Sequence, residues 1–274
     1  MERKPLRELV DEGVLLTSRA LAAGWPRRSL TLALRAQGWI RLYAGAWAEP
    51  GSTPTLATRL RAVQLVRPRL VAGHGSAAAL LLERAEVVEG LQGLRFTSAR
   101  RTLTDLLRAG PRDDAIVAVD SALGYRKVDG ARRPPLTDMA SVEATLKARS
   151  RGTARARTWL LLCDPRAGSP AETIARLRLH DAGLHPESQA EIITPAGRRV
   201  RLDFLFREAG LAVEIEGYAY HGTRDSHRQD IARFNQVLQC PEVRSLLRFT
   251  AEDVFHRPSF MIEQIRTALF TSAK

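Results

Sequence analysis

The stretch RVRLDFLFREAGLAVEIE, residues 199–216, alternates apolar and polar side chains on both sides of a short interruption. Period-two alternation predicts two β-strands, and residues 207–210 are expected to form the loop of an antiparallel hairpin between them. One face of the first strand is expected to carry Val200, Leu202, Phe204 and Phe206. This hairpin is the centre of a predicted C-terminal α/β domain.

The register of the hairpin decides which charged residues meet. If Phe206 pairs with Leu211, counting back along both strands places Asp203 opposite Glu214. Directly opposed side chains have Cβ atoms about 4.5–5.5 Å apart, where like charges repel each other. A divalent cation would remove this repulsion, and two carboxylates with the backbone carbonyl of Ile215 suit Mg²⁺, which keeps several waters. Such an ion activates water and neutralises an attacked phosphoryl group.

The same spacing allows a structural alternative. Arg199 and Arg201 would neutralise Asp203, Glu214 and Glu216 as a charge ladder on a solvated face of the sheet. Exposed ion pairs of this kind contribute about 0–1 kcal/mol each, and the ladder would carry no catalysis. Strand periodicity alone leaves both interpretations open.

A helix is predicted immediately before these strands. Ser169, Pro170 and Glu172 have the spacing of an N-cap, a first helical residue and a third helical residue, which is typical of a capping box. The helix is expected to end near Gly183, and a further strand is expected at about 189–193. Glu172 therefore has a structural role available as a capping residue.

Several short motifs follow one another in the last 107 residues. They are, in chain order, Arg201–Phe206, Ala212–Gly217, Tyr220-His221, Arg228–Asn235 and Leu246–Thr250. With the helix start at Ser169, this order resembles the endonuclease-like domain related to very-short-patch repair endonucleases, which belongs to the PD-(D/E)XK nuclease superfamily. The resemblance covers about residues 168–270.

This resemblance implies a restriction-endonuclease-like fold, in which helices flank a mixed β-sheet. It implies that Asp203 and Glu214 bind a catalytic Mg²⁺ or Mn²⁺ and that Glu172 is an accessory acid. Glu216 stands where the superfamily often has Lys. Glu is an accepted variant in similar nucleases, so the role of Glu216 in activating water or stabilising charge stays open.

Two further groups follow the hairpin. His221 is expected to act as a general base or to contact phosphate. Arg228 and Arg233 lie on a predicted helix, off its apolar stripe. They are expected to grip the nucleic-acid backbone or to form an ion-pair cluster with Asp230.

Residues 1–50 predict a winged helix-turn-helix. A short helix capped by Thr17 or Ser18 precedes a second helix at about 27–37, and a β-hairpin over 39–48 would form the wing. The second helix of such a unit enters the major groove of DNA.

The second helix is expected to present four residues outward: Arg27, Arg28, Thr31 and Arg35. The alternative is that these residues are only the solvated face of an amphipathic helix, with Leu30 and Leu34 in the core.

The chain between these domains is expected to be α-rich from residue 51 to 128. Helices are predicted at about 56–66, 77–82, 99–108 and 113–123. A basic linker and helix is expected over 129–167, which leaves 168–274 as the nuclease-like domain. The N-terminal half resembles the DNA-binding region of abortive-infection type IV antitoxins, which implies autoregulatory DNA binding and a toxin, repair or defence partner.

The distribution of charge supports an anionic partner. The 274 residues carry a net charge of +12, yet residues 168–274 contain 14 Lys and Arg against 14 Asp and Glu. The whole excess therefore lies in residues 1–167, where it would attract nucleic-acid phosphates. No apolar stretch approaches the ~18 residues of a membrane span, no signal-peptide core follows the N-terminus, and Cys163 and Cys240 form no C-x-x-C pair. A cytoplasmic protein without a disulfide framework is expected.

Two functions from different classes fit these observations. The first is a metal-dependent DNA endonuclease or nickase, targeted to double-stranded DNA by the winged helix. The second is a DNA-binding regulator or antitoxin-like protein with a catalytically degenerate nuclease-like domain. RNA cleavage is not distinguished from DNA cleavage by these residues, and a homodimer is compatible with either function.

Overall fold

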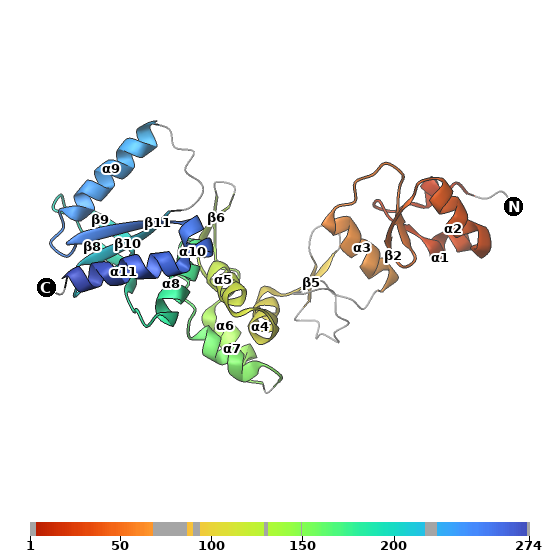
Figure 1. Cartoon of the computed structure of the whole chain (residues 1–274). Coiled ribbons are helices and arrows are strands. Elements are labelled where there is room, and N and C mark those ends of the chain that lie inside the picture. The colour runs from red at the N-terminus through yellow and green to blue at the C-terminus, as the bar shows by residue number, and fades with distance from the viewer. Residues whose placement is uncertain are drawn as a thin grey trace. The chain divides into compact units, whose positions relative to one another are not determined.

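A computed structural model describes residues 4–67, 87–89, 94–128, 131–148, 150–216 and 224–272. The side chains of residues 87–89, 127–128, 224–230 and 272 lie outside this description. The chain divides into two compact units, Met1–Thr102 and Leu103–Lys274, and contains both α-helices and β-strands, as the sequence predicts (Figure 1). In the described residues no helix is both long and apolar enough to cross a membrane.

The first unit is built around a small antiparallel sheet, whose strands lie in the order β1-β3-β2. Its elements are η1 (Leu6–Leu9), β1 (Leu15–Leu16), α1 (Thr17–Ala22), α2 (Arg27–Ala36), β2 (Ile40–Tyr43), β3 (Ala46–Ala48) and α3 (Leu56–Val66). A second antiparallel pair follows, β4 (Val87–Glu89) with β5 (Arg95–Thr97). The two expected helices and the hairpin of residues 1–50 are therefore present.

The start of α1 differs from the prediction. Thr17 is already the first helical residue, and Leu16 occupies the N-cap position without a side-chain cap. The reason is that β1 runs directly into α1, which leaves no residue between them to act as a polar cap. The core of this unit includes Leu30 and Leu34 of α2, as expected.

The second unit contains the remaining elements. They are α4 (Ala99–Ala109, which begins in the first unit), α5 (Arg112–Leu123), β6 (Arg126–Val128), β7 (Ala131–Arg133), α6 (Met139–Thr145), α7 (Thr153–Leu160), α8 (Pro170–Asp181), β8 (Glu187–Ile193), β9 (Arg199–Phe206), β10 (Leu211–Glu216), α9 (Arg224–Leu238), β11 (Ser245–Thr250), α10 (Ala251–His256) and α11 (Pro258–Ser272). The predicted helix at 77–82 lies outside the described residues.

The division between the units does not coincide with the breaks expected at 50/51, 128/129 and 167/168. The helices from α4 to α7 share one hydrophobic cluster, and Ile116 of α5 belongs to the core of the four-stranded sheet. The segment expected to be a linker after residue 129 is also structured, because β6 and β7 pair as a hairpin. Arg133 anchors this hairpin by donating a hydrogen bond to the carbonyl of Ser121.

The basic stretch before Trp159 stabilises helix ends. Arg157 donates hydrogen bonds to the carbonyls of Leu146 and Lys147 at the end of α6, and Arg155 donates to the carbonyl of Arg108. The last carbonyls of a helix lack partners within the helix, so these guanidinium groups satisfy them.

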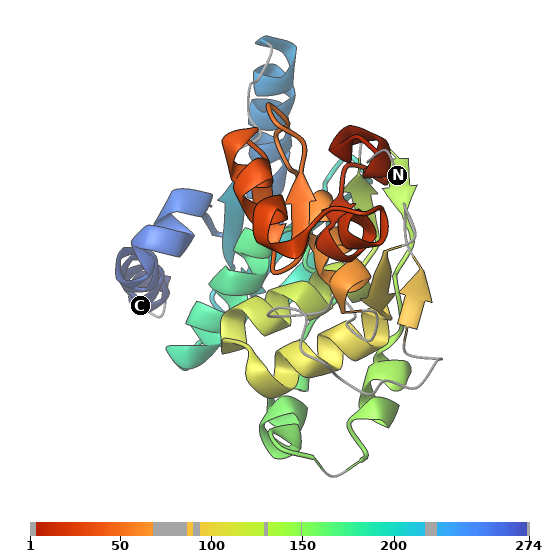
Figure 2. The same cartoon turned by 90° about the vertical axis from the view of Figure 1, so that its right-hand side faces the viewer.

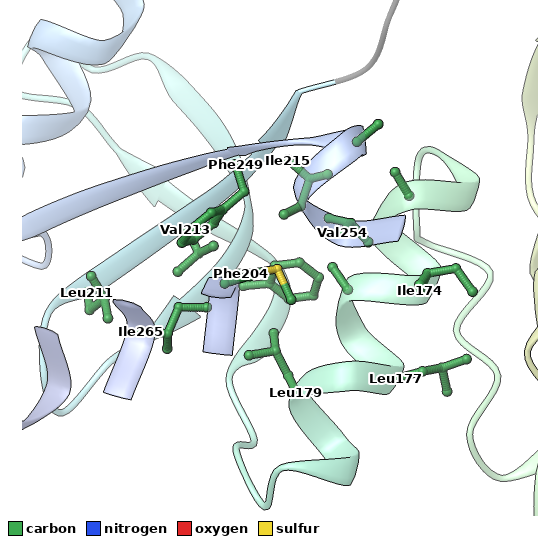
Figure 3. Close-up of a cluster of buried hydrophobic side chains, with 14 of the residues drawn as sticks. Ile174, Leu177, Leu179, Phe204, Leu211, Val213, Ile215, Phe249, Val254 and Ile265 are labelled. Carbon is green, nitrogen blue, oxygen red and sulfur yellow. The ribbon is translucent and has the colours of Figure 1, made fainter. Parts of the chain in front are cut away.

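The central sheet of the second unit is mixed. Its strands lie in the order β11-β10-β9-β8, with β10 and β11 parallel and the other pairs antiparallel. Side chains of α5, α8, α10 and α11 pack on one face, where Phe204 lies among residues of α8 and the neighbouring strands (Figure 3). The other face carries Val237 of α9, and α9 lies apart from α10 and α11 in both views (Figure 1 and Figure 2).

The apolar face of β9 is divided, contrary to the expected alternation. The four residues form two pairs, Phe204 with Phe206 on the α8 side and Val200 with Leu202 on the α9 side. The change falls at Asp203, opposite which Gln189 of β8 has a left-handed φ of 53°. Such an irregularity turns a strand locally and re-aims its side chains.

Candidate active site

The hairpin of β9 and β10 has the predicted register at its closed end. Phe206 pairs with Leu211, and the pairing continues to Phe204 with Val213. It stops one step before Asp203 and Glu214. Instead, the Oδ2 atom of Asp203 accepts a hydrogen bond of 2.8 Å from the backbone N–H of Ile215. The two strands therefore separate where the predicted metal ligands stand.

Gln189 joins two of the predicted site residues. Its Nε2 atom donates to Oε2 of Glu172 at 2.8 Å and to Oδ1 of Asp203 at 3.2 Å. A non-glycine residue with positive φ is uncommon, and such residues cluster at functional sites. Sequence reasoning did not select Gln189, because neither its residue type nor the strand pattern signals this backbone conformation.

Glu172 lies at the start of α8 and is buried. The Ser169 side chain accepts the N–H of Glu172, as predicted. The reciprocal half of the capping box is different, because Oε2 of Glu172 accepts the N–H of Gly168 at 2.6 Å rather than that of Ser169. The carboxylate of Glu172 thus extends toward β8 and β9, where Gln189 links it to Asp203.

Glu214 faces α9 and is 6% exposed. Its Oε1 atom accepts a hydrogen bond of 3.1 Å from Arg233, whose guanidinium also donates to the carbonyl of Arg201 at 2.9 Å. Arg233, predicted to form either a backbone grip or an ion-pair cluster, therefore forms an ion pair with a candidate metal ligand.

The charge ladder has a different composition from the one expected. Arg199 approaches Glu191 at 3.9 Å, and Arg248 of β11 forms the ion pair with Glu216. The cations that compensate the acidic residues of β10 come from α9, which covers the sheet face that carries Glu214, and from β11, which pairs with β10 in the sheet.

The three acidic groups of this site disfavour one another's charged forms. Burial raises the pKa of Glu214 to about 8, and the charge of Asp203 adds to this effect, with a smaller contribution from Glu172. Burial also raises the pKa of Asp203, against the hydrogen bonds from Ile215 and Gln189. The pKa of Glu172 is raised by burial and then by the charge of Asp203. Perturbed carboxylates grouped in this way are typical of functional sites.

The donor set fits a hard divalent cation. Two repelling carboxylates, Asp203 and Glu214, and the carbonyl of Ile215 are oxygen ligands of the kind that Mg²⁺ and Mn²⁺ prefer. Within the described ranges no group of three or more His, Cys, Asp and Glu side chains is arranged to hold one metal ion. A site with two carboxylates, completed by a carbonyl and water, does not require such a group.

Two predicted site residues cannot be placed. His221 lies outside the described residues, and Arg228 lies on α9 with a side chain that is not described. In the first unit, the four outward residues of α2 are all exposed: Arg27, Arg28, Thr31 and Arg35. The DNA-binding interpretation and the solvated-face alternative both expect these side chains to be exposed, so their exposure does not distinguish the two.

Comparison with known proteins found distant relatives only. Two proteins of Mycobacterium tuberculosis, the uncharacterized proteins MT2308 and Rv2248, are each 26% identical to this chain over 269 residues. Each alignment covers 87% of this chain and 95% of the relative. Since 87% exceeds either unit alone, the similarity extends into both units. No protein-family model and no solved structure matches the chain.

Proposed function

We propose that this protein is a divalent-metal-dependent endonuclease or nickase that hydrolyses phosphodiester bonds in DNA. The observation that carries the proposal is the convergence of three carboxylates from β9, β10 and the start of α8, namely the half-buried Asp203 and the buried Glu214 and Glu172, with Arg233 bonded to Glu214. The sheet, the flanking helices and this acidic cluster support a restriction-endonuclease-like fold for the second unit.

Asp203, Glu214 and the carbonyl of Ile215 would hold the Mg²⁺ or Mn²⁺ ion. Such an ion, when bound, supplies activation of water and neutralisation of charge on the attacked phosphoryl group. Gln189 holds Asp203 and Glu172 at a fixed separation through its amide. Arg233 holds Glu214, and Arg248 orients Glu216, which is the remaining candidate for interaction with the attacking water.

The first unit would supply affinity for double-stranded DNA. Its order of elements, a three-stranded sheet with α1 and α2 between β1 and β2, supports a winged helix whose α2 presents Arg27, Arg28, Thr31 and Arg35 to the groove. A cytoplasmic location follows from DNA as the substrate.

The proposal is tested with the full chain on supercoiled, nicked, mismatched and single-stranded DNA in the presence of Mg²⁺ or Mn²⁺. Wild type should cleave at least one of these substrates, and Asp203→Ala and Glu214→Ala should each lower the rate by more than about a hundredfold. Glu191→Gln, which changes an exposed acid on the same sheet, is the matched control. Wild-type protein that leaves all four substrates intact would falsify the proposal.

A second candidate is a DNA-binding regulator or antitoxin-like protein whose nuclease-like domain is inactive. It is favoured by one observation, the ion pairs of Arg233 with Glu214 and of Arg248 with Glu216, which place arginine charges on two of the acids. A DNA gel shift lost in the Arg27→Gln/Arg28→Gln variant, without cleavage under any metal, would select this candidate.

A further inference from the structure

A basic cleft lies between α9 and the start of β9. It has a volume of about 540 Å³, within the roughly 300–1,000 Å³ typical of ligand sites. Its lining residues are Arg198, Arg199, Val200, Arg201, Ala232, Arg233 and Gln236. Four of these are arginines, and no acidic side chain lines the cleft among the residues that the structure describes, so the cleft concentrates positive charge in a region of the chain whose total charge is balanced.

Internal contacts leave the charges of Arg198 and Arg199 largely uncompensated, whereas Arg201 and Arg233 lie near the carboxylates of the acidic site. Within the described part of the chain, the guanidinium groups of Arg198 and Arg201 form no hydrogen bond or ion pair, and both residues are exposed, although the charge of Arg201 lowers the pKa values of Asp203 and Glu172. Arg199 has a neighbour at 3.9 Å, Glu191, but the two side chains are 81% and 66% exposed. An ion pair so exposed contributes little. Arginines held together at this density repel one another unless an anion lies between them.

The cleft is continuous with the acidic site. Arg233 lines the cleft and also donates to Glu214. The same guanidinium binds the carbonyl of Arg201, two residues before Asp203 on β9. An anion held in the cleft would therefore lie next to the carboxylates, on the face of the sheet that α9 covers.

We propose that this cleft binds phosphates of the DNA backbone adjacent to the phosphodiester that the acidic site attacks. The inference rests on the proposed function and adds the path of the substrate, along the start of β9 and beneath α9. Guanidinium groups suit this task because they bind phosphate through two parallel hydrogen bonds. Arg198, Arg199 and Arg201 are the new binding residues, and Arg233 connects them to the carboxylates.

The test measures binding of the full chain to a short fluorescent DNA, as duplex and as single strand, in EDTA. The variant is Arg198→Gln/Arg199→Gln, which keeps the carboxylates and Arg233 unchanged. The matched control is Arg244→Gln/Arg266→Gln, two exposed arginines of the same unit outside the cleft. The same measurements are repeated with Arg27→Gln/Arg28→Gln added to each protein, because these substitutions reduce the contribution of the first unit to DNA binding.

The cleft variant should raise Kd about tenfold or more on duplex or single strand, and the control should bind like wild type. On duplex DNA, loss of two phosphate contacts should also lower the slope of log Kd against log salt by about 1.8. Equal affinities and slopes for the two double variants, in both backgrounds and on both DNAs, would overturn the inference.

Cleavage by wild type with Mg²⁺ is measured separately, so the two proposals fail independently. If wild type does not cleave but the cleft variant binds more weakly, the nuclease proposal fails and the binding cleft stands. If wild type cleaves and the cleft variant binds and cleaves equally well, the cleft assignment fails and the acidic site stands.

Discussion

Two of the places where the second unit buries carboxylates differ in their surroundings. Asp120 of α5 is 0% exposed. Its carboxylate accepts hydrogen bonds from Arg176 at 2.7 Å, from Thr173 at 2.9 Å and from the backbone N–H of Asp164 at 2.7 Å. Asp203, by contrast, acts electrostatically on two other acids, Glu172 and Glu214, and the bonded cation of this site, Arg233, donates to Glu214.

The difference separates a structural acid from a candidate catalytic one. Burial raises the pKa at both places, to about 6 for Asp120 and to about 8 for Glu214. Hydrogen-bond donors surround Asp120, and those from Thr173 and Arg176 link α5 to α8. Glu214, in contrast, is also repelled by the charges of other acids. A raised pKa alone is therefore weak evidence that a carboxylate is functional. The balance of hydrogen-bond donors and other acids around the carboxylate is stronger evidence.

The largest expected effect is at Asp120. Asp120→Ala should lower the free energy of unfolding by about 3–5 kcal/mol at neutral pH, because it leaves the largely buried Arg176 side chain, 15% exposed, without its carboxylate. Urea unfolding followed by circular dichroism measures the loss. Asp114→Ala, an exposed acid on the same helix, is the control, and equal losses in the two variants would contradict a structural role for Asp120.

The pH dependence should have a defined sign. Because burial raises the pKa of Asp120 from 3.8 to about 6, the folded chain binds this proton more tightly than the unfolded chain. The contribution of Asp120 to stability therefore falls as the pH rises from about 4 to about 6 and is constant above that. At about 1.4 kcal/mol per pKa unit the fall is about 3 kcal/mol.

Unfolding of wild type and Asp120→Asn across this pH range isolates the effect. Wild type should lose stability relative to the variant as the pH rises through the window. A difference between the two proteins that does not change with pH would contradict the raised pKa.

At the acidic site, removal of a carboxylate should raise the stability of the chain rather than lower it. Glu214→Gln should raise the free energy of unfolding by about 1–2 kcal/mol at neutral pH without metal, because a pKa of about 8 means that this carboxyl must take up a proton when the chain folds, a cost that the neutral amide does not have. Thermal unfolding in EDTA checks this, with the exposed Glu191→Gln as control. A loss of stability comparable to that of Asp120→Ala would show that the two carboxylate sites have the same structural role.

The smallest effect is expected in the first unit. Arg27→Gln/Arg28→Gln should weaken duplex binding several-fold and lower the salt slope by about 1.8, while leaving the unfolding of both units unchanged. Arg7→Gln/Arg59→Gln, two exposed arginines elsewhere in this unit, is the matched control. Equal binding by the two double variants would favour the solvated-face interpretation of α2.

Much of the local structure could be predicted from the sequence. The helix Leu56–Val66 and the pairing of Phe206 with Leu211 agree with the expected positions, because helical and strand periods are local and a four-residue loop sets the register. The predicted start of α1, with Thr17 or Ser18 as its cap, was wrong by one or two residues, since β1 runs directly into the helix and Leu16 takes the N-cap position. The boundary between the units could not be predicted, because it depends on which helices share a core.

The sequence by itself determined the candidate carboxylates, the elements that carry them and the concentration of net positive charge in residues 1–167. Only the tertiary structure decided that Gln189 joins Glu172 to Asp203, that Arg233 pairs with Glu214 and that four arginines line one cleft. The physical reason is that the pKa and the role of an acidic side chain depend on its burial and on the residues that surround it in space. Those partners are distant in the chain, 56 residues from Asp120 to Arg176 and 19 from Glu214 to Arg233.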